Sequence, residues 1–157
     1  MKTKFVLLIV CMVLVLAACT PDLVVTDLET TGQATVNGDG SAEVPIRVVV
    51  KNQGSSAAGI FKVATEYTGP QGTFVVAFTV PGQTSSWYPY TGAPLSTGDE
   101  KTFDGKVTFH PSVHGVNVSL KAIADSCSGD EFMPVYCRVE EGNESNNESV
   151  TVSVLLP

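Results

Sequence analysis

The chain has 157 residues, of which 43% are hydrophobic and 16% charged, and it contains 14 glycines and 9 prolines. This length is enough to bury the core of one domain, and this composition argues against a disordered segment, a coiled coil or a helical bundle. The formal net charge of -7 makes the electrostatic part of nucleic-acid binding repulsive, so no nucleic-acid partner is expected.

The first 18 residues have the features of a secretory signal. Lys2 and Lys4 precede an apolar run over residues 5–18, which is shorter than the roughly 20 residues of a membrane-spanning helix. The run ends in Leu16-Ala17-Ala18-Cys19, which resembles the lipobox of bacterial lipoproteins, where the cysteine after the cleavage site carries the lipid. The alternative is an ordinary secretory signal followed by an incidental cysteine.

Cleavage before Cys19 predicts a lipid-anchored domain outside the cytoplasm. It separates a signal over residues 1–18 from a single domain over residues 19–157, whose core spans about 21–156. It also removes two lysines and changes the net charge from -7 to -9, which disfavours direct contact with anionic lipid. Because two or three acyl chains anchor a protein stably, the expected location is the cell envelope, with the membrane contact made through the lipid on Cys19.

From residue 21 onward the sequence predicts short strands and has no sustained helical period. β-branched and aromatic residues recur between clusters of Gly, Pro, Asn and Ser. Seven segments follow this pattern, at residues 22–29, 43–52, 59–68, 73–80, 101–109, 116–124 and 148–156. Together they predict an all-β fold, an immunoglobulin-like seven-stranded antiparallel β-sandwich.

Alternation within these segments predicts which side chains face the core. Every second residue of the segment 43–52 is apolar, and so is every second residue near the C-terminus: Val44, Ile46, Val48 and Val50, then Val150, Val152, Val154 and Leu156. The turn Gly69-Pro70-Gln71-Gly72 is expected to join residues 59–68 and 73–80 into a hairpin. Asn37-Gly38-Asp39-Gly40 is interpreted as a turn, because a calcium loop would need later acidic ligands.

Residues 80–99 form a long connection that contains three aromatic residues, Trp87, Tyr88 and Tyr90. Pro89 and the neighbouring Gly and Ser residues disfavour a strand core there. Aromatic side chains in a loop can stack on a sugar ring or anchor a protein interface. The alternative is that they fold back and cap one end of the sandwich.

No pattern of a catalytic site is present in the sequence. His110 and His114 are four residues apart, but Pro111 and Gly115 disfavour the helix that would bring them to one face. They are therefore expected in a loop between two strands. Neither a zinc-protease motif nor a nucleophile elbow occurs, and no enzymatic activity is expected.

Cys127 and Cys137 are predicted to form a disulfide. Cys11 leaves with the signal and Cys19 carries the lipid, so these two cysteines remain as a pair in an oxidising compartment. The segment between them contains no histidine or further cysteine that would complete a zinc site.

Acidic and amide side chains gather in the sequence around this cysteine pair. They are Asp125, Asp130, Glu131, Glu140, Glu141, Asn143 and Glu144. Calcium prefers oxygen ligands of this kind, so calcium is the one candidate cofactor. The alternative is a solvated acidic loop that adds solubility.

Several segments together resemble a CARDB domain, the cell-adhesion-related domain of bacterial and archaeal surface proteins. They are residues 21–25, 48–54, 57–58, 61–63 and 139–147, and the last of these, VEEGNESNN, is the most specific. The resemblance spans nearly the whole mature chain and implies a seven-stranded sandwich with a role in adhesion or ligand presentation, without catalysis. Asn52, Gly54, Asn146 and Asn147 are expected to serve turns rather than a ligand.

The expected function is a non-enzymatic, lipid-anchored binding or adhesion module. Its aromatic loop and disulfide loop are expected to face a surface glycan or a protein. The alternative is a structural or assembly subunit of a cell-envelope complex, in which an edge strand such as residues 73–80 pairs with another chain.

Overall fold

The computed structural model describes residues 19–84, 87–127 and 137–157. Eight strands lie in these ranges: β1 (Leu23–Thr30), β2 (Thr35–Val36), β3 (Ala42–Asn52), β4 (Val63–Gly69), β5 (Gly72–Thr79), β6 (Glu100–Phe109), β7 (Asn117–Ala124) and β8 (Val152–Leu155). Every pair is antiparallel, and the strand order is β1-β3-β6-β5-β4-β7-β8, with β2 paired to β3 next to β1. Within the described ranges, no helix has the length and apolar character needed to cross a membrane.

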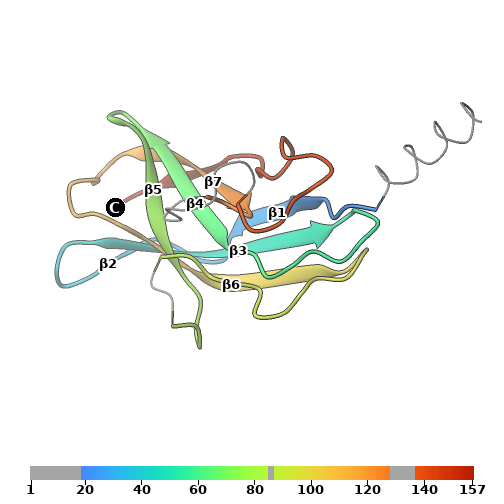
Figure 1. Cartoon of the computed structure of the whole chain (residues 1–157). Coiled ribbons are helices and arrows are strands. Elements are labelled where there is room, and N and C mark those ends of the chain that lie inside the picture. Colours follow the sequence, from blue (N-terminus) through green and yellow to red (C-terminus); the bar gives the residue numbers. More distant parts are fainter. Residues whose placement is uncertain (1–18, 85–86, 128–136) are drawn as a thin grey trace, which may run out of the picture.

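Strand β5 connects the two layers of the sandwich (Figure 1). Its first half pairs with β4, and its last three residues, from Ala77 to Thr79, pair with β6. One layer therefore contains β1, β3 and β6, and the other contains β4, β7 and β8. This is the predicted immunoglobulin-like all-β fold, with the hydrogen-bonded path continuous through β5.

Gly105 lets β5 approach β6 closely. A Cβ atom at this position would lie 2.2 Å from the carbonyl oxygen of Thr79 and 2.9 Å from the ring of Phe78. Glycine within a strand often marks such a close approach of another backbone.

The expectation that residues 73–80 form an edge strand is wrong. β5 lies between β6 and β4 in the strand order, and the end strands are β1 and β8. Its pairing changes from β4 to β6 after Val76, and a local sequence pattern contains no information about such a change of partner.

The core lies between the two layers and follows the predicted alternation. Val44, Ile46, Val48 and Val50 of β3 are at most 1% exposed. They pack in one cluster with side chains of β6, β4 and β7, among them Phe103, Phe109, Val63, Leu120 and Ala122. Burying such side chains contributes about 1.5–3 kcal/mol each relative to exposure.

The alternation fails at the start of the last predicted segment, where Val150 is 79% exposed. Here the side chain of Ser149 interrupts the ladder, because its Oγ accepts a hydrogen bond from the Ala122 N–H at 2.9 Å and donates one to the Val150 carbonyl at 2.7 Å. Strand β8 therefore begins only at Val152, and Val154 and Leu156 reach the core as predicted.

The sandwich has two ends, which we call the motif end and the turn end. At the motif end β1 begins opposite the last residue of β3, and Ala124 at the end of β7 donates its N–H to Asn147. The turns 37–40 and 69–72 and the loop 110–116 lie at the turn end. His110 and His114 are in this loop between β6 and β7, which confirms the prediction that they lie between two strands. Strand β3, with 11 residues, spans about 35 Å between the two ends at about 3.4 Å per residue.

Candidate functional site

The residues that follow Cys19 are held by hydrogen bonds from two loops. The carbonyl oxygens of Thr20 and Asp22 accept the N–H groups of Ser55 and Gln53 at 3.0 and 2.8 Å, and the Pro21 carbonyl accepts the Gly142 N–H at 2.9 Å. Gln53 and Gly142 lie in two segments of the sequence resemblance, 48–54 and 139–147, and Ser55 directly follows the first of them. We call residues 20–23, 52–55 and 141–147 the N-terminal clamp.

Two glycines allow the clamp to close on the chain. A Cβ atom on Gly54 would lie 2.5 Å from backbone atoms of Thr20, Pro21 and Asp22. A Cβ atom on Gly142 would lie 2.6 Å from the Thr20 hydroxyl. A larger residue at position 54 would require the N-terminal backbone to shift, whereas one at position 142 would require the Thr20 hydroxyl to move.

Asn52 is fully buried and forms the centre of the first clamp loop. Its Oδ1 accepts the N–H groups of Asp22 and Gly54 at 3.2 and 3.1 Å. Its Nδ2 donates to the carbonyl oxygens of Ser56 and Leu95 at 2.8 and 2.9 Å. All of the polar groups of this side chain are therefore used to hold backbone, which is what a buried amide requires.

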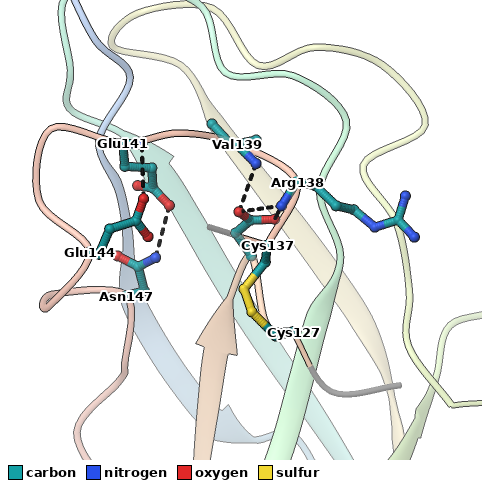
Figure 2. The surroundings of a disulfide bond; sticks show 8 residues. Cys127, Cys137, Arg138, Val139, Glu141, Glu144 and Asn147 are labelled. Atoms are coloured by element: carbon teal, nitrogen blue, oxygen red, sulfur yellow. Dashed lines mark hydrogen bonds between the residues drawn. A yellow bond between two sulfur atoms is a disulfide. The ribbon is translucent and has the colours of Figure 1, made fainter. Parts of the chain in front are cut away.

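Glu141 holds the clamp from the other side and is 8% exposed. Its Oε2 accepts the N–H of Leu23, and its Oε1 accepts the Asn147 Nδ2 at 2.8 Å. The Glu141 N–H in turn donates to Glu144 Oε1 at 2.9 Å (Figure 2). Burial raises the pKa of Glu141 to about 7, against the lowering effect of the Leu23 N–H, and the nearby charges of Glu144 and Asp125 also raise it.

Asn146 adds a side-chain bond to the clamp. Its Nδ2 donates to Asp22 Oδ1 at 2.9 Å, while Gln53 Nε2 donates to the other carboxylate oxygen of Asp22, also at 2.9 Å. The carboxylate of Asp22 is thus shared between the two clamp loops.

The Cys127–Cys137 disulfide is confirmed, and it stands beside the second clamp loop (Figure 2). Asp125, which has a positive φ of 46°, accepts the N–H groups of Arg138 and Val139 on Oδ2 at 3.0 and 2.8 Å. Burial raises the pKa of Asp125, and these two N–H groups partly offset that effect. The disulfide and the Asp125 carboxylate together fix residues 137–139, which lead into the clamp loop 141–147.

The predicted calcium ligands are not brought together as one site in the part of the chain that the structure describes. Asp125, Glu141 and Glu144 accept backbone N–H groups, and Asn143 accepts the N–H and hydroxyl of Ser145. Glu140 is exposed, and Asp130 and Glu131 lie outside the described residues. Within the described ranges no group of three or more His, Cys, Asp or Glu side chains could hold a metal ion; calcium binding stays a prediction, tested by melting with and without calcium.

The aromatic residues of the long β5–β6 connection divide into two kinds. Trp87 is 52% exposed, whereas Tyr88 and Tyr90 are half-buried. Lys62 Nζ lies 4.8 Å from the centre of the Tyr88 ring, and the Arg138 guanidinium lies 5.1 Å from that of Tyr90. Such contacts between a cation and a ring face hold both tyrosines in place.

The backbone of this connection is bound to the sheet. The Val63 and Phe78 N–H groups donate to the Pro89 and Trp87 carbonyls at 2.9 and 3.1 Å. The Gln83 side chain donates to the Tyr90 carbonyl and accepts the Tyr90 N–H, at 2.9 and 2.8 Å. Beside these bonds runs an open groove of about 490 Å³, lined by Gly82, Gln83, Thr84, Tyr90, Thr91 and Gly92.

The N-terminal clamp and the contacts of Lys62 and Arg138 with two tyrosine rings were not predicted from the sequence. The clamp joins residues up to 124 positions apart. The cation–ring contacts likewise join Lys62 and Arg138 to tyrosines that are distant in the sequence. The available signal was that the segments 21–25, 48–54 and 139–147 all contribute to the same resemblance, which suggests a shared role without saying that they touch.

Comparison with known proteins places this fold in a family. No curated protein matches the chain. Among solved structures it is similar to the CARDB domain of a Pyrococcus furiosus protein in complex with di-metal ions, with 22% identity, a TM-score of 0.46, and 88% of this chain and 90% of that chain covered. It is also similar to part of a β-glucosidase from Paenibacillus barengoltzii, with 14% identity, a TM-score of 0.39, and 88% and 15% covered. The CARDB family model matches residues 20–151, which include the whole N-terminal clamp, and the chain therefore belongs to the CARDB family.

Proposed function

We propose that this protein is a non-catalytic binding or adhesion module of the cell envelope, anchored by lipid on Cys19. CARDB membership supports an adhesion-related β module. The Cys127–Cys137 disulfide supports a location outside the cytoplasm, because such bonds persist in oxidising compartments. The Leu16-Ala17-Ala18-Cys19 pattern supports the anchor, and Cys19 is exposed and free of a disulfide.

The observation that carries the binding proposal is the exposed Trp87 on a fixed loop. Its carbonyl is bound to β5, and its neighbours Tyr88 and Tyr90 are held by cations. A half-exposed indole on ordered backbone presents apolar area with little loss of conformational entropy on binding. The groove on the same connection is lined by the Thr84 side chain and by Gln83, whose amide holds the Tyr90 backbone. A surface glycan, or a protein with an apolar anchor, is the ligand class that fits.

Fluorescence tests this proposal directly because Trp87 is the only tryptophan. A panel of envelope polysaccharides is titrated into the mature domain, and the emission of Trp87 is followed. We expect a saturable shift with at least one of them. Trp87→Ala should abolish binding, measured by calorimetry, with little change in stability, whereas Phe74→Ala, which removes a 44% exposed ring on β5, should leave binding intact. Equal binding by wild type and Trp87→Ala would contradict the proposal.

The anchor has a separate test. In a bacterial host, the wild-type protein should fractionate with membranes, and Cys19→Ala should release the processed protein into the soluble fraction. A processed Cys19→Ala protein that stays in the membrane fraction would contradict lipid anchoring.

The exposed C-terminal edge favours a second candidate function, as an assembly subunit. β8 is an end strand of the described sheet, and Leu155 on it is 65% exposed. End strands accept partner strands, and a charge placed on them prevents this. If the protein acts this way, Leu155→Lys should remove cross-linking to an envelope partner, and Trp87→Ala should not.

A further inference from the structure

We infer that the N-terminal clamp seats the sandwich directly on the membrane surface, with the motif end toward the bilayer and the turn end away from it. This inference rests on the lipid anchor proposed above and adds the orientation of the domain, which an anchor alone does not set. It follows from where the first held residue lies relative to Cys19.

No linker separates the anchor from the folded domain. Thr20, the residue after Cys19, already has its carbonyl bound by the Ser55 N–H at 3.0 Å. The Pro21 and Asp22 carbonyls accept the Gly142 and Gln53 N–H groups, and the Asp22 and Leu23 N–H groups donate to the side chains of Asn52 and Glu141. One residue spans at most about 3.6 Å, so lipid attached to Cys19 must lie next to the clamp.

The clamp itself is tightly packed against this segment. Gly54 and Gly142 leave no space for a Cβ beside Thr20 and Pro21, and Pro21 has a fixed φ. By contrast, a flexible ten-residue Gly/Ser linker would have a root-mean-square end-to-end distance of about 16–19 Å and would let the domain rotate freely. In this protein the residues that follow Cys19 are instead bound to the domain, through the carbonyls of residues 20–22.

The surface charge of the domain does not provide this orientation. The mature chain is strongly acidic, and an acidic surface is repelled by anionic lipid. At the motif end Lys51 is already paired with Glu100 at 3.5 Å. The orientation therefore depends on the short connection and not on attraction between the domain and lipid headgroups.

The geometry assigns opposite environments to the two ends. The loop 95–99 lies at the motif end, because Asn52 binds the Leu95 carbonyl and exchanges backbone bonds with Gly98 and Asp99. The β4–β5 turn lies at the turn end, about 35 Å away along the strands. Thr97 and Gln71 are exposed representatives of the two ends.

Quenching of site-specific labels tests the orientation. The full precursor carrying Thr97→Cys or Gln71→Cys is lipidated in a bacterial host, labelled with a fluorophore, and reconstituted in phosphatidylcholine vesicles that contain a headgroup quencher. We expect quenching at residue 97 to exceed that at residue 71 at least threefold. In a matched protein with ten Gly/Ser residues inserted between Cys19 and Thr20, the two labels should be quenched to a similar extent.

The outcomes separate this inference from the anchor. Vesicle-bound wild-type protein with equal quenching at both positions would overturn the orientation and leave the anchor standing. If the protein does not associate with vesicles at all and behaves like Cys19→Ala, the anchor itself is wrong and the orientation falls with it.

Discussion

At the residue scale, the two clamp glycines differ in the atoms that surround them. A Cβ on Gly54 would meet backbone atoms, whereas one on Gly142 would meet the hydroxyl of the Thr20 side chain. Overpacking of this kind costs about 1–3 kcal/mol. We expect Gly54→Ala to lose about 2–3 kcal/mol of unfolding free energy in urea denaturation and Gly142→Ala about 1 kcal/mol.

Two controls accompany this glycine comparison. Gly38→Ala, at a glycine with no atom within 4 Å of the added Cβ, should change stability by less than about 0.5 kcal/mol. Thr20→Ala should relieve most of the cost of Gly142→Ala, since it removes the hydroxyl in the way. Equal losses at residues 54 and 38 would mean that the clamp does not hold the N-terminal segment.

Glu141 gives the domain a predictable pH dependence. Its pKa of about 7 in the folded state lies above the ordinary glutamate value of 4.5, so the folded state binds a proton more tightly than the unfolded state. Stability from this group is therefore fully present below about pH 4.5 and is lost as pH rises through about 7. The separation of the two values corresponds to at most about 3 kcal/mol.

Glu141→Gln tests this dependence because it keeps an oxygen acceptor and removes the charge. Urea denaturation between pH 5 and 8 should show wild-type stability falling as pH rises and a clearly flatter profile for the variant. Asp125, whose pKa burial also raises, should leave a smaller slope of the same sign. A wild-type profile that rises with pH over this range would contradict the assignment.

At the element scale, the disulfide closes a short loop beside the clamp, with a sequence separation of 10. The chain-entropy model gives about 2–3 kcal/mol for a loop of this size. Reduction of the wild-type protein should therefore lower its unfolding free energy by about this amount. A double variant, Cys127→Ser with Cys137→Ser, should have a lower unfolding free energy from the start, and the reductant should not change it. A wild-type protein whose unfolding free energy does not change on reduction would contradict this prediction.

The last strand tests where the alternating pattern ends. Val154 is 5% exposed and belongs to the core cluster, whereas Val150 is 79% exposed although the same alternation includes it. Val154→Ala should cost about 1–3 kcal/mol in thermal or urea unfolding, and Val150→Ala less than about 0.5 kcal/mol. Similar losses at both positions would mean that β8 begins earlier than Val152.

Most strands were predictable because their alternation is local. Each residue of β3 needs only its own neighbours to show which face is apolar, and its burial follows the pattern without exception. β2 was missed because two residues carry no period. The change of partner by β5 was missed because strand pairing depends on residues far away in the chain. The late start of β8 was missed because the sequence does not show that the Ser149 side chain takes a hydrogen bond from β7.

The clamp shows the same limit at the candidate site. The sequence indicated that Asn52, Gly54, Asn146 and Asn147 serve backbone conformation rather than a ligand. The sequence did not indicate that these residues bind the N-terminal segment. Asn52, Gly54 and Asn146 contact residues 20–22 directly, and Asn147 binds Glu141, which accepts the Leu23 N–H. Turn residues and clamp residues have the same local signature, and only the fold distinguishes them.

At the scale of the whole molecule, the clamp lies between Cys19, the residue proposed to carry the lipid, and the strands that hold the aromatic connection. Residues 20–22, which the clamp loops hold, lead directly into β1, and β1 pairs along β3 almost to the turn end. If Cys19 carries lipid as proposed, a domain held this close to its anchor has a restricted orientation at the membrane. The aromatic connection is fixed to β4 and β5 through backbone bonds, so the proposed anchor would also limit the directions in which Trp87 can face.

Amide hydrogen exchange of the mature domain tests the central claim most directly, namely that the clamp loops 52–55 and 141–147 hold the residues after Cys19. The Gln53, Ser55 and Gly142 N–H groups, which lie outside the strands and donate to residues 20–22, should be protected like the β1–β3 ladder. Deletion of residues 20–22 should make these three amides exchange at loop rates while β6 and β7 stay protected. Fast exchange of the three amides in the intact domain would contradict the account.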